Sequence, residues 1–218
     1  MRKATTELIL VRHGETDWNT EKRLQGHIDT PLNAAGRNQA LALAAALAAS
    51  AADHVISSDL VRTLDTARPI ADLLGLEIET NRNLRERCFG AFEGLQSDQI
   101  AARFPDAWRQ WQAREVDARY PAGERIAETL AEFEARVGKV LAAIGQAWPG
   151  KRVIVVTHGG FLDGAYRLAT AMALSAPRNF DVRNASINRF EWHAPRGLRL
   201  LEWGAVAHLP SALDEMLR

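Results

Sequence analysis

Two continuous apolar segments, at 8–11 and 153–156, constrain the fold of this chain most strongly. The first runs into Arg12 and His13, the second is followed by Thr157 and His158, and a glycine follows each of these two histidines. Apolar runs without polar alternation are typical of strands that are buried on both faces of a parallel sheet. Each strand would therefore carry an imidazole to a turn, where the glycine lets a phosphate approach the backbone.

The composition narrows the class of protein. A chain of 218 residues suffices for one core with a small inserted cap, so we expect a single domain over 1–218. Its 27 Lys and Arg balance its 27 Asp and Glu, which gives no overall positive field for nucleic acid or an anionic membrane. The single cysteine, Cys88, excludes an internal disulfide and a cysteine-built zinc site. No signal peptide and no membrane span are predicted, and we expect a cytoplasmic protein.

Strand and helix patterns alternate along the chain and predict a three-layer α/β/α sandwich with a mostly parallel central sheet. The expected elements, in chain order, are a strand at 7–12, a helix at 34–50 capped by Asn33, a strand at 54–57, a helix to 74 capped by Ser58 or Asp59, a strand at 76–80, an amphipathic helix at 124–148, a strand at 152–157, a helix from 159 to about 173 and a hairpin over 184–206. Short helical pieces at 96–123, broken by Pro105 and Pro121, predict a cap insertion.

Ligands of open parallel sheets bind at the carboxyl ends of the strands, where Arg12, His13, Arg62 and His158 are expected to meet. Two guanidiniums and two imidazoles repel one another unless an anion lies among them. Phosphate fits, because each arginine offers charge-assisted hydrogen bonds worth about 1.5 to 3 kcal/mol. A neutral His13 can attack phosphorus, and His158 would stabilise the transferring oxygens.

Other side chains leave alternatives open. A leaving alkoxide needs a proton donor, and spacing alone does not choose among Glu15, Glu86 and Glu93. Trp108 and Trp111 are expected to pack a small core in the cap rather than stack on a substrate. The remaining four histidines, at 27, 54, 193 and 208, have no metal-ligand spacing, so we expect neither a metal nor a cofactor. Cys88 is expected to be an ordinary thiol, with oxidation promoted by Arg85 and Arg87 as the alternative.

The segment 10–19, which reads LVRHGETDWN, resembles the signature of the histidine phosphatase superfamily in its phosphoglycerate mutase-like branch. Further matching blocks lie at 25–26, 29–33, 57–63, 84–86, 90–94 and 157–160, so the resemblance covers nearly the whole chain. It implies that His13 is the nucleophile and Glu86 the general acid and base. It also implies a substrate pocket that includes Arg12, Asn19, Gln25, Gly26, Arg62, His158 and the backbone N–H of Gly159.

The activity implied by the resemblance is that of a phosphomonoesterase acting on a small phosphorylated metabolite through a phosphohistidine. The chain is most similar to the short enzymes described as probable or second phosphoglycerate mutases, many of which behave as phosphatases. A mutase that interconverts 2- and 3-phosphoglycerate is the alternative, and a catalytically silent phosphate binder is a third. No metal is required in either enzyme, and a homodimer is left open. Gly123, Glu124 and Arg125 depart from the Gly-Glu-Ser common in such phosphatases, which leaves the cap contacts undecided.

Overall fold

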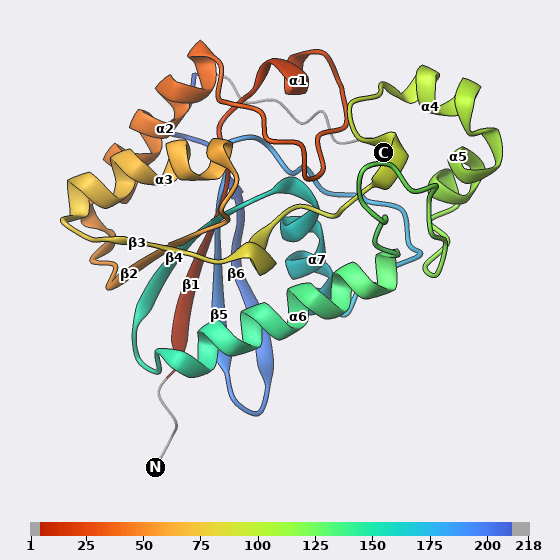
Figure 1. Cartoon of the computed structure of the whole chain (residues 1–218). Helices are drawn as coiled ribbons and strands as arrows, with labels where there is room; N and C mark the ends of the chain where they lie inside the picture. The colour runs from red at the N-terminus through yellow and green to blue at the C-terminus, as the bar shows by residue number, and fades with distance from the viewer. Residues whose placement is uncertain (1–4, 211–218) are drawn as a thin grey trace.

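A six-stranded sheet lies at the centre of the computed structural model, which describes residues 5–210 (Figure 1). Its order is β3 (Ile78–Thr80), β2 (His54–Ser57), β4 (Arg152–Thr157), β1 (Thr6–Arg12), β5 (Ile187–His193) and β6 (Gly197–Ala205). The first four strands pair in parallel, whereas β5 pairs antiparallel with both β1 and β6. The expected α/β fold with a mostly parallel sheet is confirmed.

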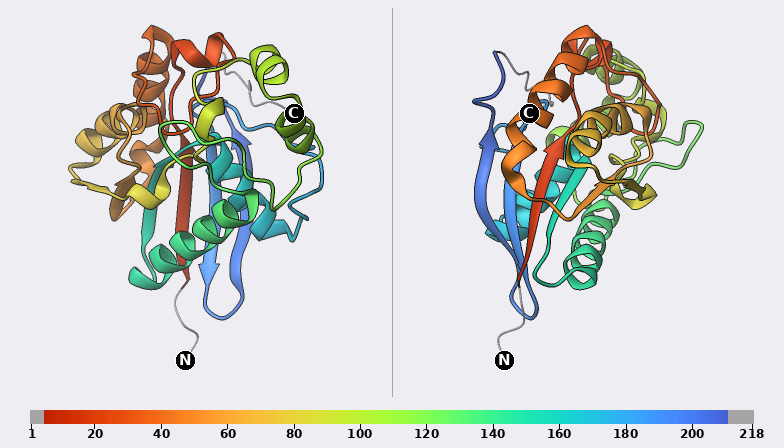
Figure 2. Two further views of the ribbon diagram at one scale, coloured as in Figure 1. Left: turned by 45° about the vertical axis from the view of Figure 1, so that its right-hand side comes forward. Right: turned by 90° about the vertical axis from the view of Figure 1, so that its left-hand side faces the viewer.

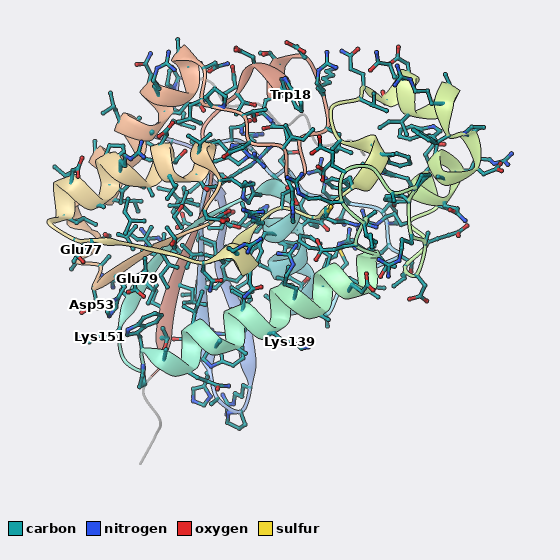
Figure 3. The ribbon with its side chains drawn as sticks, viewed as in Figure 1. Trp18, Asp53, Glu77, Glu79, Lys139 and Lys151 are labelled. Atoms are coloured by element: carbon teal, nitrogen blue, oxygen red, sulfur yellow. The ribbon has the colours of Figure 1, made fainter. Side chains whose placement is uncertain are left out.

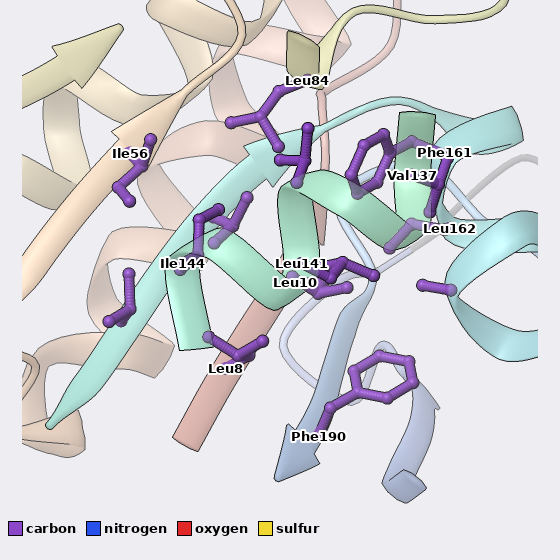
Figure 4. Packing of buried hydrophobic residues seen from close by; sticks show 14 of the residues in the cluster. Leu8, Leu10, Ile56, Leu84, Val137, Leu141, Ile144, Phe161, Leu162 and Phe190 are labelled. Carbon is purple, nitrogen blue, oxygen red and sulfur yellow. The ribbon is translucent and has the colours of Figure 1, made fainter. Parts of the chain in front are cut away.

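Helices cover both faces of this sheet. On one face, α2 (Ala34–Leu47) and α3 (Val61–Leu74) pack against Ile9, Val11 and the like-facing residues of β4. On the other face, α6 (Leu130–Ala147) and α7 (Gly159–Thr170) pack against Leu8, Leu10 and their β4 neighbours (Figure 4). The views of Figure 2 show α6 lying across this second face. The continuous apolar runs of β1 and β4 are therefore explained, because successive side chains supply two cores.

The start of α6 differs from the prediction. A helix was expected from 124, but α6 begins at Leu130. Thr129 is its N-cap and accepts from the N–H of Glu132, while the Glu132 side chain accepts from the N–H of Thr129. This capping box ends the helix on its N-terminal side. Ile126, which fitted the apolar spacing, is 72% exposed and lies before the cap.

The cap of α3 also differs. Neither Ser58 nor Asp59 caps this helix; its N-cap is Leu60, which offers no side-chain acceptor. The first helical N–H, that of Val61, donates instead to Asp29 Oδ1 at 2.7 Å, from the long loop after β1. Asp59 accepts two hydrogen bonds from Arg85, at 2.6 and 2.7 Å. The predicted cap of α2 is confirmed, since Asn33 Oδ1 accepts from the N–H of Gly36 at 2.8 Å.

The segment between β3 and α6 contains α4 (Ser97–Arg103) and α5 (Pro105–Gln112) above the carboxyl edge of the sheet. It has a small core of its own, made of Phe92, Ile100, Tyr120 and Ala127. Trp108 and Trp111 pack against that core, as expected. Trp111 also stacks on Phe89, with 5.2 Å between the ring centroids.

The two edges of the sheet have different surroundings (Figure 3). Trp18, on the single-turn helix α1 (Asp17–Thr20), lies at the carboxyl edge of the sheet. Asp53 and Lys151 form a surface ion pair at the opposite edge, with 2.8 Å between Oδ1 and Nζ. Between residues 5 and 210, no helix has both the length and the apolar character that a membrane span requires.

Candidate active site

A cavity of about 100 Å³ lies at the carboxyl edge of β1. Its walls include Arg12 and His13 from the end of β1, Arg62 from the first turn of α3, and Glu86 from the loop after β3. The remaining lining residues are Asn19, Lys22, Arg23, Leu24, Gln25, Gly26, Phe89 and Trp111. The cavity thus lies at the edge where the rule for open parallel sheets predicts a ligand site.

The pairing of β1 with β4 brings the two histidines together. Arg12 lies opposite Thr157, and the N–H of His13 donates to the carbonyl of Thr157 at 3.0 Å. The imidazole rings of His13 and His158 consequently lie edge to face, with 5.3 Å between their centroids. Two residues far apart in the sequence thus form one constellation.

The hydrogen bonding of His13 fixes its tautomer. Its Nδ1 lies 2.7 Å from the carbonyl oxygen of Gly14. Because a carbonyl only accepts, the proton lies on Nδ1 and the lone pair on Nε2. Burial, followed by the positive charges of Arg62 and Arg12, holds the pKa of His13 well below its usual value. The ring is therefore neutral near pH 7, which is the form that a nucleophile needs.

Arg62 and Arg12 supply positive charge to the cavity and are almost entirely buried. Arg62 donates from Nη1 to the carbonyl of Ile28 at 2.9 Å and from Nη2 to that of Gly26 at 2.8 Å. Arg12 Nη1 donates to the carbonyl of Val182. Burial lowers the pKa of Arg62 to about 10, so its guanidinium remains charged near pH 7. Two buried cations beside a neutral imidazole favour an anionic ligand.

His158 and Gly159 are not among the residues that line this cavity. The His158 side chain is fully buried, and its Nε2 lies 2.9 Å from Ser58 Oγ. Burial, then the charge of Arg62, lowers the pKa of His158 well below its usual value. The constellation therefore contains two neutral imidazoles, of which only His13 borders the cavity.

The three candidate carboxylates have different surroundings. Glu86 borders the cavity, and its oxygens accept from the N–H groups of Arg87 and Gly160, both at 2.8 Å. Burial raises the pKa of Glu86, although these two N–H groups oppose the shift. A raised pKa favours the protonated carboxyl that a general acid needs.

Glu15 and Glu93 instead hold loops in place. Glu15 Oε1 accepts from Asn33 Nδ2 at 2.9 Å. Glu93 Oε1 accepts from the N–H groups of His27 and Phe89, both at 3.0 Å. Neither carboxylate borders the cavity, so the geometry separates Glu86 from its competitors.

Asn19, on α1, and Gln25 and Gly26, in the loop after it, line the cavity, and each also has a structural contact there. Asn19 Oδ1 accepts from the N–H and hydroxyl of Thr16, at 2.9 and 3.0 Å, as part of the capping box of α1. Gln25 Oε1 accepts from Thr30 Oγ1 at 2.6 Å. Gly26 has a φ of 52°, and an added Cβ would lie 2.1 Å from Glu93 Oε1. Glycine is therefore required at this turn.

Sequence reasoning did not identify five of the lining residues. Lys22, Arg23 and Leu24 fall between Asn19 and Gln25, so the motif residues on either side could have indicated them. Phe89 and Trp111 gave no such signal, because they meet only through the packing of the cap.

The structure offers no metal centre and no reactive thiol within residues 5–210. No group of three or more His, Cys, Asp or Glu side chains in this part of the chain is arranged to hold a metal ion. Burial raises the pKa of Cys88 to about 11. The alternative prediction, that neighbouring arginines promote a reactive thiolate at Cys88, is therefore wrong.

Comparison with known proteins places this geometry in context. The sequence model of the histidine phosphatase superfamily (branch 1) matches residues 8–205. Phosphoglycerate mutase-like protein 4 of Arabidopsis thaliana is 38% identical over 93% of this chain and 86% of its own length. The probable phosphoglycerate mutase GpmB of Citrobacter koseri is 36% identical over 97% of this chain and 99% of its own.

Solved structures are similar over almost the whole chain. YhfR of Bacillus stearothermophilus has a TM-score of 0.84 and 29% identity, covering 93% of this chain and 98% of that one. A mycobacterial glucosyl-3-phosphoglycerate phosphatase, solved in complex with VO3, has a TM-score of 0.77 and 29% identity, covering 94% of this chain and 100% of that one.

Proposed function

The chain belongs to branch 1 of the histidine phosphatase superfamily, and on this premise we propose that it hydrolyses phosphate monoesters of a small metabolite through a phosphohistidine on His13. The observation that carries the proposal is the hydrogen bond from His13 Nδ1 to the Gly14 carbonyl, 2.7 Å long. It leaves the Nε2 lone pair for attack, in a cavity that Arg12 and Arg62 make favourable for an anion.

In the first step, His13 Nε2 forms a bond to phosphorus while the bond from phosphorus to the ester oxygen breaks. Arg12 and Arg62 stabilise the negative charge on the phosphoryl oxygens, and His158 supports the ring of His13 from behind. Protonated Glu86 gives its proton to the departing alkoxide, which leaves as an alcohol.

In the second step, water replaces the alcohol. Glu86, now a carboxylate, accepts a proton from the water as its oxygen attacks the phosphohistidine. The bond to His13 Nε2 breaks, inorganic phosphate leaves, and Glu86 regains its proton. One residue thus acts as acid and then as base.

A phosphoglycerate mutase is the second candidate, because relatives at 36% and 38% identity are named as mutases or mutase-like proteins. Hydrolysis is favoured by similar solved structures that are named as phosphatases. The single cysteine supports the cytoplasm as the compartment.

The test compares two rates for the same enzyme preparation. One assay follows release of inorganic phosphate from a panel of phosphate monoesters, and the other follows interconversion of 2- and 3-phosphoglycerate. We expect release to be faster on at least one ester, and acid-labile, alkali-stable protein phosphate to appear in quenched reactions. His13→Ala should lose both signals, whereas His54→Ala, at the start of β2 and outside the cavity lining, should keep them. Turnover without any phosphoprotein would contradict the covalent route, and faster interconversion would favour the mutase.

A further inference from the structure

A second cavity, of about 80 Å³, shares Phe89 and Trp111 with the catalytic cavity. Its other walls come from the end of α5, the first turns of α6 and α7, and the segment after α7. Three arginines line it: Arg87, Arg114 and Arg178. None of the groups proposed to react with substrate lies on its walls, so hydrolysis does not explain it.

The second cavity lies directly behind Glu86. Arg87 and Gly160, which both line it, are the residues whose N–H groups hold the Glu86 carboxylate, each at 2.8 Å. A group bound there would therefore contact the same short backbone segments that position the proposed general acid. Phe89 and Trp111, whose rings stack on each other, line both cavities, so the second cavity adjoins the phosphate pocket at these rings.

Arg87 places in this cavity a buried hydrogen-bond donor that a ligand would satisfy. Its side chain is only 7% exposed, and its guanidinium lies 4.8 Å from the ring centroid of Tyr120. Nε donates to the carbonyl of Glu128 at 2.9 Å, but Nη2 is buried without a hydrogen-bond partner among the residues described. Burial lowers the pKa of Arg87. A buried donor of this kind costs free energy that an anionic oxygen would offset.

Two acidic side chains, Asp163 and Glu134, also line the cavity, and their charges bear on those of Arg87 and Arg114. Asp163 is committed to Arg167, with 2.8 Å between Oδ2 and Nε, and lies 3.5 Å from Arg114 Nη2. Burial, followed by the charge of Asp163, raises the pKa of Glu134 to about 7. Near neutral pH much of Glu134 is therefore uncharged, so Glu134 does not fully offset the positive charge of Arg87 and Arg114.

We propose that this second cavity binds a small anionic group, a carboxylate or a phosphate, through Arg87 and Arg114. The group comes either from the far end of a substrate whose phosphate occupies the catalytic cavity or from a free anion. The first source rests on the proposed phosphatase function, and the second does not. A cation is disfavoured by the arginines, and a neutral group would give Nη2 of Arg87 no charged acceptor.

Calorimetric titration of the full chain carrying His13→Ala tests the proposal without turnover. The probes are phosphate monoesters of straight-chain hydroxy acids of increasing length, each matched to the diol monophosphate of equal length. Acetate, with acetamide as its neutral counterpart, tests the free anion. We expect the acid esters to bind more tightly than the diol esters at one optimal length. Arg114→Gln should weaken that preference about 10- to 100-fold, the loss of one charge-assisted hydrogen bond.

Arg109→Gln is the matched control, because Arg109 lies on α5 in an exposed pair with Asp106 and lines neither cavity. Arg87→Gln is the second test, after circular dichroism has shown that it folds. Saturable acetate binding that is lost in Arg114→Gln, with no preference among the esters, would assign the cavity to a free anion. If neither arginine variant alters ester or acetate binding, the proposal is wrong. Wild-type enzyme that binds these probes but hydrolyses no ester would overturn the proposed function alone.

Discussion

Replacing Gly160 by alanine should displace the side chain of Glu86, the proposed general acid, without changing its chemical identity. A Cβ added at Gly160 would lie 2.1 Å from Glu86 Oε1 and 3.0 Å from Glu86 Cδ. Ordinary contact begins at about 3.4 Å, so the carboxylate oxygen must retreat by about 1.3 Å, the difference between 3.4 and 2.1 Å. The backbone of Gly160 is helical, in the first turn of α7, and itself accepts alanine.

The cost of this displacement follows from the geometry of proton transfer. A misplacement of about 1 Å in a reacting group costs roughly 10²-fold in rate, which is about 2.7 kcal/mol of barrier. The loss should fall on alkyl phosphates, whose leaving alkoxide needs the proton. It should be under about tenfold for p-nitrophenyl phosphate, because its leaving group departs without protonation. Glu86→Gln should give the same pattern, with a loss of about 10²- to 10⁴-fold on alkyl esters.

The assay measures kcat on both esters for the two variants and for Gly138→Ala. Gly138 lies inside α6, and an added Cβ would meet only Leu168 Cδ1, at 3.7 Å. This control should keep full activity and gain about 0.5 to 1 kcal/mol of stability, since alanine is the better helix former. A folded Gly160→Ala enzyme with wild-type kcat on alkyl phosphates would refute Glu86 as the acid held at that position.

Three further predictions concern stability and reactivity. Asp29→Ala should lower the free energy of unfolding by about 1 kcal/mol in urea, because it removes the acceptor for the first N–H of α3, whereas Asp29→Asn should keep most of it; equal losses would exclude the capping role. Glu134→Gln should stabilise the protein at pH 8 but not at pH 4. The pKa of Glu134 is raised to about 7 in the folded protein, so the wild-type protein loses stability as the pH rises from the ordinary carboxyl pKa to 7. The largest possible loss is about 3.4 kcal/mol, and solvent screening reduces the expected gain in Glu134→Gln to about 1 to 2 kcal/mol. No gain in the free energy of unfolding at pH 8 would contradict this prediction. Cys88 should react with a disulfide reagent slowly in the native protein and rapidly in urea, because its pKa is about 11 and it is buried; fast native labelling would count against this.

The parts of the fold that local pattern determines could be predicted from the sequence. Both central strands, the N-cap at Asn33 and the edge where the histidines meet follow from apolar runs, capping chemistry and the parallel-sheet rule. The predicted start of α6 was wrong because Ile126, an exposed apolar residue, lies by chance at helical spacing from the residues of the helix. The capping box at Thr129 is the stronger signal, and the helix begins after it.

Contacts between distant segments could not be predicted in this way. The acceptor that caps α3 is Asp29, which belongs to a different loop, so no local motif contains it. The same limit applies to the general acid: Glu15, Glu86 and Glu93 are equivalent as residue types, and only their neighbours in space separate them. Phe89 and Trp111 border the cavity because the packing of the cap brings their rings together, and no local sequence pattern records that contact.

The pairing of β1 has a consequence for biosynthesis. The strand that leads to the proposed nucleophile is the first of the six along the chain, yet its neighbours β4 and β5 are the fourth and fifth. Until they emerge from the ribosome, both edges of an apolar strand stay open to pairing with other chains. Since contacts between such distant segments slow folding, the protein should need chaperone protection or a low concentration while it is synthesised.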